Sequence, residues 1–137
     1  MTPAADQDAA RTAATPVTPV TPETARRVAQ AWIDAWNDHN LEAILSHYAD
    51  AVVFTSPVAV RRMNLLDGTV RGKAPLREYF GKGLSVQPPL HFDLQDVLVG
   101  VDSVAVVYRN QRGQRVVETM HLDSRGQVYR AVVHYAG

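Results

Sequence analysis

The stretch that decides the fold is RVVETMHLDSRGQVYRAVVHY, residues 115–135. Apolar residues alternate with polar ones in two runs, and a turn that contains Gly126 separates the runs. This period of two predicts two antiparallel strands joined as a hairpin. Glu118 interrupts the pattern, because it shares a strand face with Val116 and Met120, where burying a carboxylate costs free energy. We therefore expect Glu118 to face a pocket.

The residues before this hairpin divide into a helical part and a strand-forming part. Apolar residues spaced three and four apart predict two successive helices over residues 22–48 and a third over 73–84. Thr21 suits the N-cap of the first helix, and Pro22 suits its first turn. A strand is expected over 51–57, a loop with a short strand over 58–70, and four antiparallel strands over 90–100, 103–111, 114–122 and 127–136.

This order of elements predicts a single α+β domain. The expected architecture is a cone-shaped, curved antiparallel sheet wrapped around helices, spanning residues 21–137. Residues 1–20 are rich in Ala, Thr and Pro and are expected to form a disordered leader. A chain of 137 residues is long enough for one core and too short for two comfortable ones.

The composition argues against several classes of function. The 14 basic and 14 acidic residues cancel, so no net charge favours nucleic acid or an acidic membrane surface as partner. No apolar run reaches the roughly 20 residues that span a bilayer, and the N-terminus lacks the apolar segment of a signal peptide. The chain has no cysteine, which fits a cytoplasmic location.

Motifs for cofactors and metals are also missing from the sequence. The five histidines show no metal-binding spacing, and neither a phosphate-binding loop nor a nucleophile elbow occurs. We therefore expect no metal site and no cofactor.

Aromatic residues are the candidates for the wall of the pocket. Trp32 and Trp36 lie one helical turn apart and could form such a wall, although ordinary core packing explains the pair equally well. The predicted ligand contacts are Trp32, Trp36, Tyr48, Phe54, Ser56, Phe80, Tyr108, Met120 and Tyr135, with Glu118 as the acid or base.

Two alternatives stay open at this point. Glu118 could instead be an exposed strand residue that pairs with Arg109 or Arg130. Tyr108 shares a face with Glu118 only if the following turn carries a glycine bulge, because a plain two-residue turn would bring Arg109 inward.

Val and other apolar residues occur on both faces of the predicted sheet. One face packs against the helices. We expect the other face to be covered by a second copy of the chain in a homodimer.

Three stretches in this order resemble the nuclear transport factor 2-like superfamily, and especially its SnoaL-like bacterial members. They are AWNDHNLEAILSHYADAVVFTSP, GTVRGKAPLREYF and LDSRGQVYRAVVHY, and the resemblance covers about residues 22–136. It implies a cone-shaped, cystatin-like α+β barrel with a deep pocket, and frequently a dimer. It does not imply one function, because this fold hosts several chemistries.

Within this superfamily, ketosteroid isomerase uses an aspartate base and an oxyanion hole of a tyrosine and a protonated aspartate. The resemblance places Trp32 where that tyrosine lies, Ser56 where the base lies, and Glu118 where the protonated aspartate lies. A serine hydroxyl cannot abstract a carbon-bound proton unaided. We therefore do not expect a ketosteroid isomerase.

The expected function is that of a SnoaL-like pocket protein. It would bind or transform a hydrophobic, carbonyl-containing metabolite by isomerase-, cyclase- or dehydratase-like acid–base chemistry. The alternative is a non-catalytic ligand-binding or protein-interaction module of the same fold.

Overall fold

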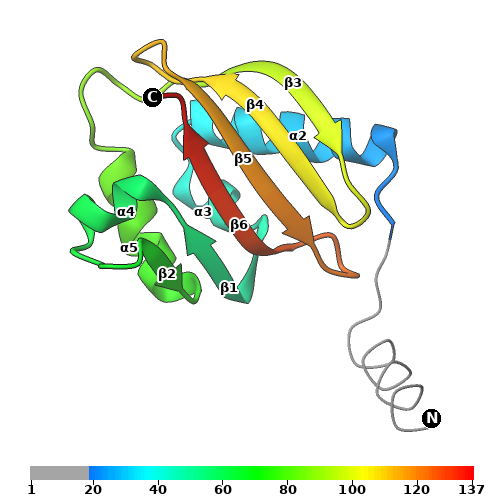
Figure 1. Cartoon of the computed structure of the whole chain (residues 1–137), viewed down its shortest axis with the longest axis horizontal. Helices are drawn as coiled ribbons and strands as arrows, with labels where there is room; N and C mark the ends of the chain where they lie inside the picture. The colour runs from blue at the N-terminus through cyan, green and yellow to red at the C-terminus, as the bar shows by residue number, and fades with distance from the viewer. Residues whose placement is uncertain (1–18) are drawn as a thin grey trace, which may run out of the picture.

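The structure is a computed structural model that describes residues 19–137 (Figure 1). Helix α2, Pro22–Asn37, begins at the N-cap Thr21, whose hydroxyl accepts a hydrogen bond from the Thr24 N–H at 3.1 Å. The Val20 N–H donates to the Val101 carbonyl at 2.9 Å, so the domain includes the last residue assigned to the leader. The expected disorder of residues 1–18 lies outside the described residues.

A six-stranded sheet forms the body of the domain (Figure 1). Its strands are β1 Tyr48–Thr55, β2 Thr69–Arg71, β3 Asp93–Val99, β4 Ser103–Arg109, β5 Arg115–Leu122 and β6 Val128–Tyr135, in the order β2-β1-β6-β5-β4-β3. The four C-terminal strands are antiparallel, as predicted. The sheet as a whole is mixed, which corrects the expected antiparallel sheet, because β1 pairs in parallel with β6. A parallel pair needs a long connection, and here most of the domain lies between the two strands.

Three shorter helices complete the chain, and two of them differ from the prediction. They are α3 Leu41–Leu45, α4 Pro57–Arg62 and α5 Lys73–Gly83. Helix α3 ends earlier than expected, so Tyr48 starts β1 instead of ending a helix. Helix α4 replaces a predicted loop: the Ser56 hydroxyl caps it, and Pro57 fills its first turn.

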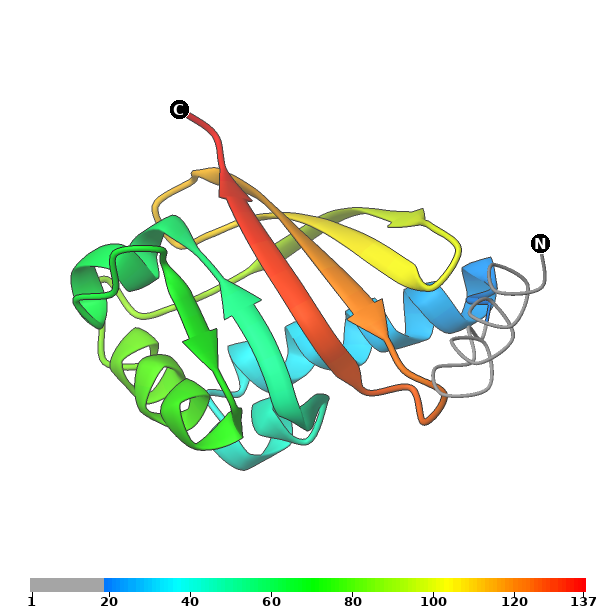
Figure 2. The same ribbon diagram turned by 60° about the horizontal axis from the view of Figure 1, so that its bottom comes forward.

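The helices α2, α3 and α5 lie on one side of the curved sheet, and within residues 19–137 no layer covers the other side (Figure 2). The core fills the space between sheet and helices, with Trp32, Ile44, Leu76 and Val106 among its fully buried side chains. This arrangement confirms the predicted class, a single α+β domain with a curved sheet around helices.

The turn between β4 and β5 determines which side chains face this interior. The Asn110 N–H donates to the Gln114 carbonyl, and the Gly113 N–H donates back to the Asn110 carbonyl. Gly113 has φ of 74°, so the turn is a three-residue loop with a glycine bulge. This geometry puts Tyr108 on the inner face and leaves Arg109 exposed.

Candidate functional site

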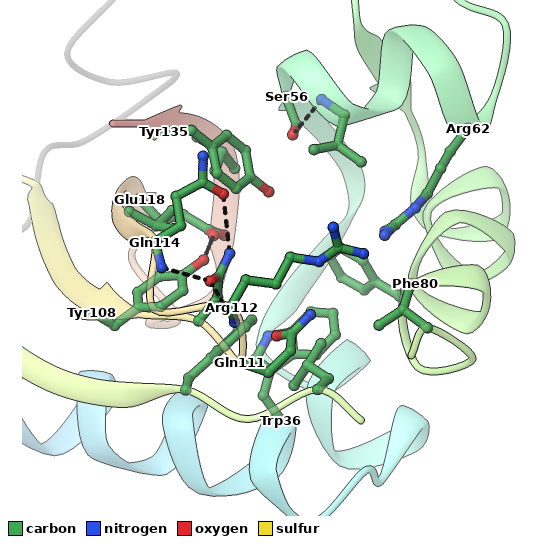
Figure 3. Close-up of a pocket in the computed structure, with 18 of the residues that line it drawn as sticks. Trp36, Ser56, Arg62, Phe80, Tyr108, Gln111, Arg112, Gln114, Glu118 and Tyr135 are labelled. Atoms are coloured by element: carbon green, nitrogen blue, oxygen red, sulfur yellow. Dashed lines mark hydrogen bonds between the residues drawn. The ribbon is translucent and has the colours of Figure 1, made fainter. Parts of the chain in front are cut away.

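A pocket with a cavity volume of about 190 Å³ opens between the β4–β5 turn, helix α4 and the C-terminal half of α5 (Figure 3). An apolar cavity of about 150 Å³ is enough to hold benzene, so this pocket has room for a small ring compound. Its apolar and aromatic wall includes Trp36, Phe54, Val58, Tyr79, Phe80, Leu90, Phe92, Tyr108, Val116, Val133 and Tyr135, and its polar lining includes Ser56, Arg61, Arg62, Gln111, Arg112 and Glu118.

Glu118 is the single carboxylic acid in this lining, and it is buried, with 4% of its surface exposed. Its Oε1 accepts a hydrogen bond from the Tyr108 hydroxyl at 3.3 Å. Its Oε2 is buried and has no hydrogen-bond partner among the described residues. Burial raises the pKa of Glu118 to about 8, although the hydrogen bond from Tyr108 opposes the rise. Near neutral pH the carboxyl group therefore holds its proton.

The contacts of the Glu118 carboxyl group indicate which of its two oxygens carries the proton. Tyr108 donates to Oε1, so Oε1 acts as the carbonyl oxygen of the acid. The proton then belongs on Oε2, where no protein acceptor among the described residues takes it. A protonated Glu118 therefore offers a free hydrogen-bond donor to a bound molecule.

The buried tyrosines of the pocket stay protonated near neutral pH. The pKa of Tyr108 is raised well above its usual value by burial and by Glu118. Burial, with smaller contributions from Tyr79 and Glu118, raises the pKa of Tyr135 to about 12. Because these phenols stay protonated, the pocket contains neutral donors around one ionisable acid.

Ser56 is held by the backbone and by a neighbouring phenol. Its Oγ accepts from the Val58 N–H at 3.2 Å and from the Tyr79 hydroxyl at 3.3 Å. The hydroxyl therefore caps α4 and orients Tyr79, which leaves its oxygen no capacity to act as a base.

Two further polar atoms in the lining lack partners among the described residues. They are the indole N–H of Trp36 and the side-chain oxygen of Gln111, both buried. A buried polar group without a hydrogen bond is costly, and each such group in a native structure calls for an explanation. These two atoms and Glu118 Oε2 are the buried side-chain nitrogen and oxygen atoms without a hydrogen-bond partner in residues 19–137. All three belong to residues that line this pocket.

The mouth of the pocket is basic. Arg62 and Arg112 extend toward each other from opposite sides of the opening (Figure 3), and Arg61 also contributes to the lining. Within residues 19–137 no carboxylate lies within 4.0 Å of any of these three guanidinium groups. The Arg62 Cζ lies 6.0 Å from the centre of the Tyr79 ring, which fixes one side of the mouth.

The structure gathers most of the sequence-predicted site residues around this pocket. Trp36, Phe54, Ser56, Phe80, Tyr108, Glu118 and Tyr135 all line it. Trp32, Tyr48 and Met120 do not: they are fully buried in the core. The Trp32 indole N–H donates to the Tyr48 hydroxyl at 2.9 Å, so these two residues satisfy each other behind the wall.

Some lining residues escaped prediction from the sequence. Tyr79 precedes the predicted Phe80, but both residues of an adjacent helical pair rarely face one cavity. Gln111 and Arg112 belong to a turn, where polar residues are usually solvated. No sequence signal shows that this turn contributes to the pocket, although Gly113 indicates its bulged geometry.

Within residues 19–137, no cluster of three or more His, Asp or Glu side chains could hold a metal ion. None of the helices described is both long and apolar enough to cross a membrane.

The chain belongs to the SnoaL-like domain family, whose model matches residues 29–136. Its fold is that of the nuclear transport factor 2-like superfamily, as the resemblance predicted. No curated protein matches the chain.

Solved structures of the same fold include relatives of different kinds. A SnoaL-like protein of unknown function from Burkholderia thailandensis is 42% identical, with a TM-score of 0.83, over 88% of this chain and 100% of the other. A cystatin-like protein of unknown function from Methylobium petroleophilum is 12% identical, with a TM-score of 0.69, over 88% and 80%. The epoxide hydrolase/cyclase-like enzyme SalBIII, linked to pyran ring formation in salinomycin, is 18% identical, with a TM-score of 0.67, over 83% and 92%.

Proposed function

We propose that this protein binds a compact hydrophobic ring compound with a carbonyl group and transforms it by cofactor-independent acid–base chemistry of the isomerase, cyclase or dehydratase kind. The observation that carries the proposal is Glu118, a buried carboxyl group with one free oxygen in an aromatic pocket. The SnoaL-like family and the similarity in fold to a cyclase-like enzyme support it as analogy.

Glu118 can take part in such a reaction in either protonation state. Below its pKa of about 8, the Oε2–H donates to the ligand carbonyl oxygen and stabilises the negative charge that develops there, while a solvent water molecule takes the α-proton. Above that pKa, the carboxylate can take the α-proton itself. A pKa close to the working pH is the condition under which one group acts well as acid and base.

The experiment that tests this function follows the exchange of the α-hydrogens of a ketone for deuterium. A two-ring ketone such as 1-tetralone is incubated with the protein in D₂O, and NMR records the loss of the α-proton signal. We expect the protein to accelerate exchange over the protein-free solution by about 10²–10⁴-fold, and Glu118→Gln to abolish the acceleration.

A second candidate, a non-catalytic binding protein, rests on Ser56. In the position that carries the base of ketosteroid isomerase, this chain has a serine that already caps α4 and accepts from Tyr79. A protein that binds the ketone tightly and leaves its exchange rate unchanged would establish this candidate and contradict the enzymatic one.

The proposal also includes a homodimer through the uncovered face of the sheet. One row of paired residues crosses all six strands on that face without a charged member: Leu98, Ala105, Thr119, Val132, Thr55 and Thr69. Leu98 in this row is 52% exposed in the single chain. Light scattering should give twice the chain mass at micromolar concentration, and Thr119→Arg should halve it. A monomeric wild-type protein would overturn this part.

The cytoplasmic location also stays part of the proposal, and cell fractionation tests it.

A further inference from the structure

The charge of the pocket lining departs from the charge of the whole chain. The chain carries 14 basic and 14 acidic residues and is neutral overall. The lining carries three arginines and one carboxyl group, Glu118, which holds its proton near neutral pH. With three arginines and a protonated Glu118, the lining carries a formal charge of +3. Ionisation of Glu118 lowers that charge by one, to +2.

Two of these arginines lie on opposite sides of the mouth with no carboxylate partner among residues 19–137. Arg62 lies at the end of α4, and Arg112 lies at the tip of the β4–β5 turn. Figure 3 shows the two side chains reaching toward each other across the opening. Within residues 19–137 their side-chain contacts are with neutral groups: Arg112 donates to the Gln87 carbonyl at 3.4 Å, and Arg62 faces the Tyr79 ring. Guanidinium groups bind carboxylates through paired, charge-assisted hydrogen bonds, so a carboxylate between them could pair with both arginines.

The unpaired atoms of the lining define the rest of the ligand. Glu118 Oε2 and the Trp36 N–H need acceptors, and the Gln111 oxygen needs a donor. The same lining includes apolar side chains such as Phe54, Phe80 and Val133. A basic mouth, apolar walls and unpaired polar atoms in one pocket match a ring-bearing molecule with both an acid group and a carbonyl group.

We infer that the ligand of this pocket is an organic anion, a ring-bearing carboxylic acid whose carboxylate lies between Arg62 and Arg112 and whose ring and carbonyl group extend toward Glu118. This inference rests on the proposed function, because it names the substrate class of the same site. It goes beyond that proposal in requiring the negative charge.

The test compares acids with their uncharged methyl esters. A panel of one- to three-ring aromatic carboxylates, such as benzoate and 2-naphthoate, is paired with the corresponding methyl esters. Binding to the full-length protein is measured by quenching of tryptophan fluorescence, since Trp36 lines the pocket. We expect at least one acid of the panel to bind at least tenfold more tightly than its ester, and this preference to shrink as salt is added.

Variants assign the preference to particular residues. Arg112→Gln changes an exposed turn residue and should leave the fold intact, and Arg62→Gln/Arg112→Gln removes both charges. We expect both variants to lose the preference for the acid and to keep the affinity for the ester. Arg115→Gln is the matched control, since Arg115 is an exposed arginine near the same turn that does not line the pocket. It should keep the preference.

The outcomes separate this inference from the proposed function. If acids and esters bind equally, or if Arg112→Gln and the double variant retain the preference, the anionic ligand is wrong and the ring-binding pocket stands. If neither acids nor esters bind, both the inference and the proposed function are contradicted.

Discussion

The Tyr108 hydroxyl donates to Glu118 Oε1 at 3.3 Å inside a pocket whose other walls are largely aromatic. The two residues lie diagonally on the same face of neighbouring strands, Tyr108 opposite Val116 and Glu118 opposite Val106, in the register that the glycine bulge at Gly113 permits. The contact leaves one carboxyl oxygen free, and the proposed chemistry depends on that oxygen.

Stability should depend on pH through Glu118. The folded protein has a Glu118 pKa of about 8, raised from 4.5, so the folded state holds this proton more tightly than the unfolded state. The free energy of unfolding should therefore be highest near pH 4.5 and fall by a few kcal/mol as the pH rises to about 8, after which this contribution is lost. Urea denaturation between pH 5 and 9 measures the slope.

Glu118→Gln is the control for this slope. The variant keeps the shape of the side chain and removes its ionisation, so stability should become flatter over the same range and exceed that of the wild type at pH 9. Equal slopes for the two proteins would rule out Glu118 as their origin.

Removing the Tyr108 hydroxyl should raise the pKa of Glu118 further. The hydrogen bond from Tyr108 lowers this pKa, so Tyr108→Phe deletes a stabilising contact of the ionised form. The pH midpoint of α-hydrogen exchange should move upward. Tyr129→Phe is the control, because the Tyr129 hydroxyl donates to Asp102 outside the pocket lining. A lower pH midpoint of exchange in Tyr108→Phe would contradict the assignment of Tyr108 as donor and Glu118 as acceptor.

Tyr48→Phe tests whether Tyr48 belongs to the hydrophobic core or to the ligand pocket. The variant takes the acceptor from the buried Trp32 N–H, which should cost about 1–3 kcal/mol of stability. Because Tyr48 does not line the pocket, affinity for ring compounds should change less than twofold. Calorimetric unfolding and fluorescence binding measure the two effects. Weaker binding without loss of stability would place Tyr48 in the site after all.

Gly113→Ala tests the turn that positions Tyr108. Gly113 has φ of 74°, where an added Cβ meets no neighbouring atom, so the cost is purely conformational and should be about 1–2 kcal/mol. Gly81→Ala is the matched control: its Cβ also meets open space, but it lies inside α5, where alanine should stabilise the helix. A neutral Gly113→Ala would refute the strained turn.

The sequence predicted the fold well where local patterns were strong. The alternation from residue 90 onward predicted the four-strand meander, and apolar spacing predicted α2 and α5. Parallel pairing of β1 with β6 was not predictable, because no local pattern specifies a partner so distant along the chain. Helix α4 was missed although Ser56 and Pro57 are favourable for a helix start, because valines at 58 and 60 favour strand.

The site was only partly predictable for a similar reason. Glu118 was found because a carboxylate within an apolar strand pattern is costly. Trp32 and Tyr48 share the composition of the pocket wall but lie one layer behind it, and composition does not distinguish the two layers. Arg112 joins the site through the fold of a turn, which only the three-dimensional structure shows.

The most direct test of the account is the titration of Glu118 itself. Carboxyl ¹³C NMR of glutamate-labelled protein, with Glu118→Gln to assign the signal, should show a midpoint at about 8. A midpoint near the ordinary value of 4.5 would mean that the carboxylate is solvated and charged, and that the proposed acid–base role is wrong.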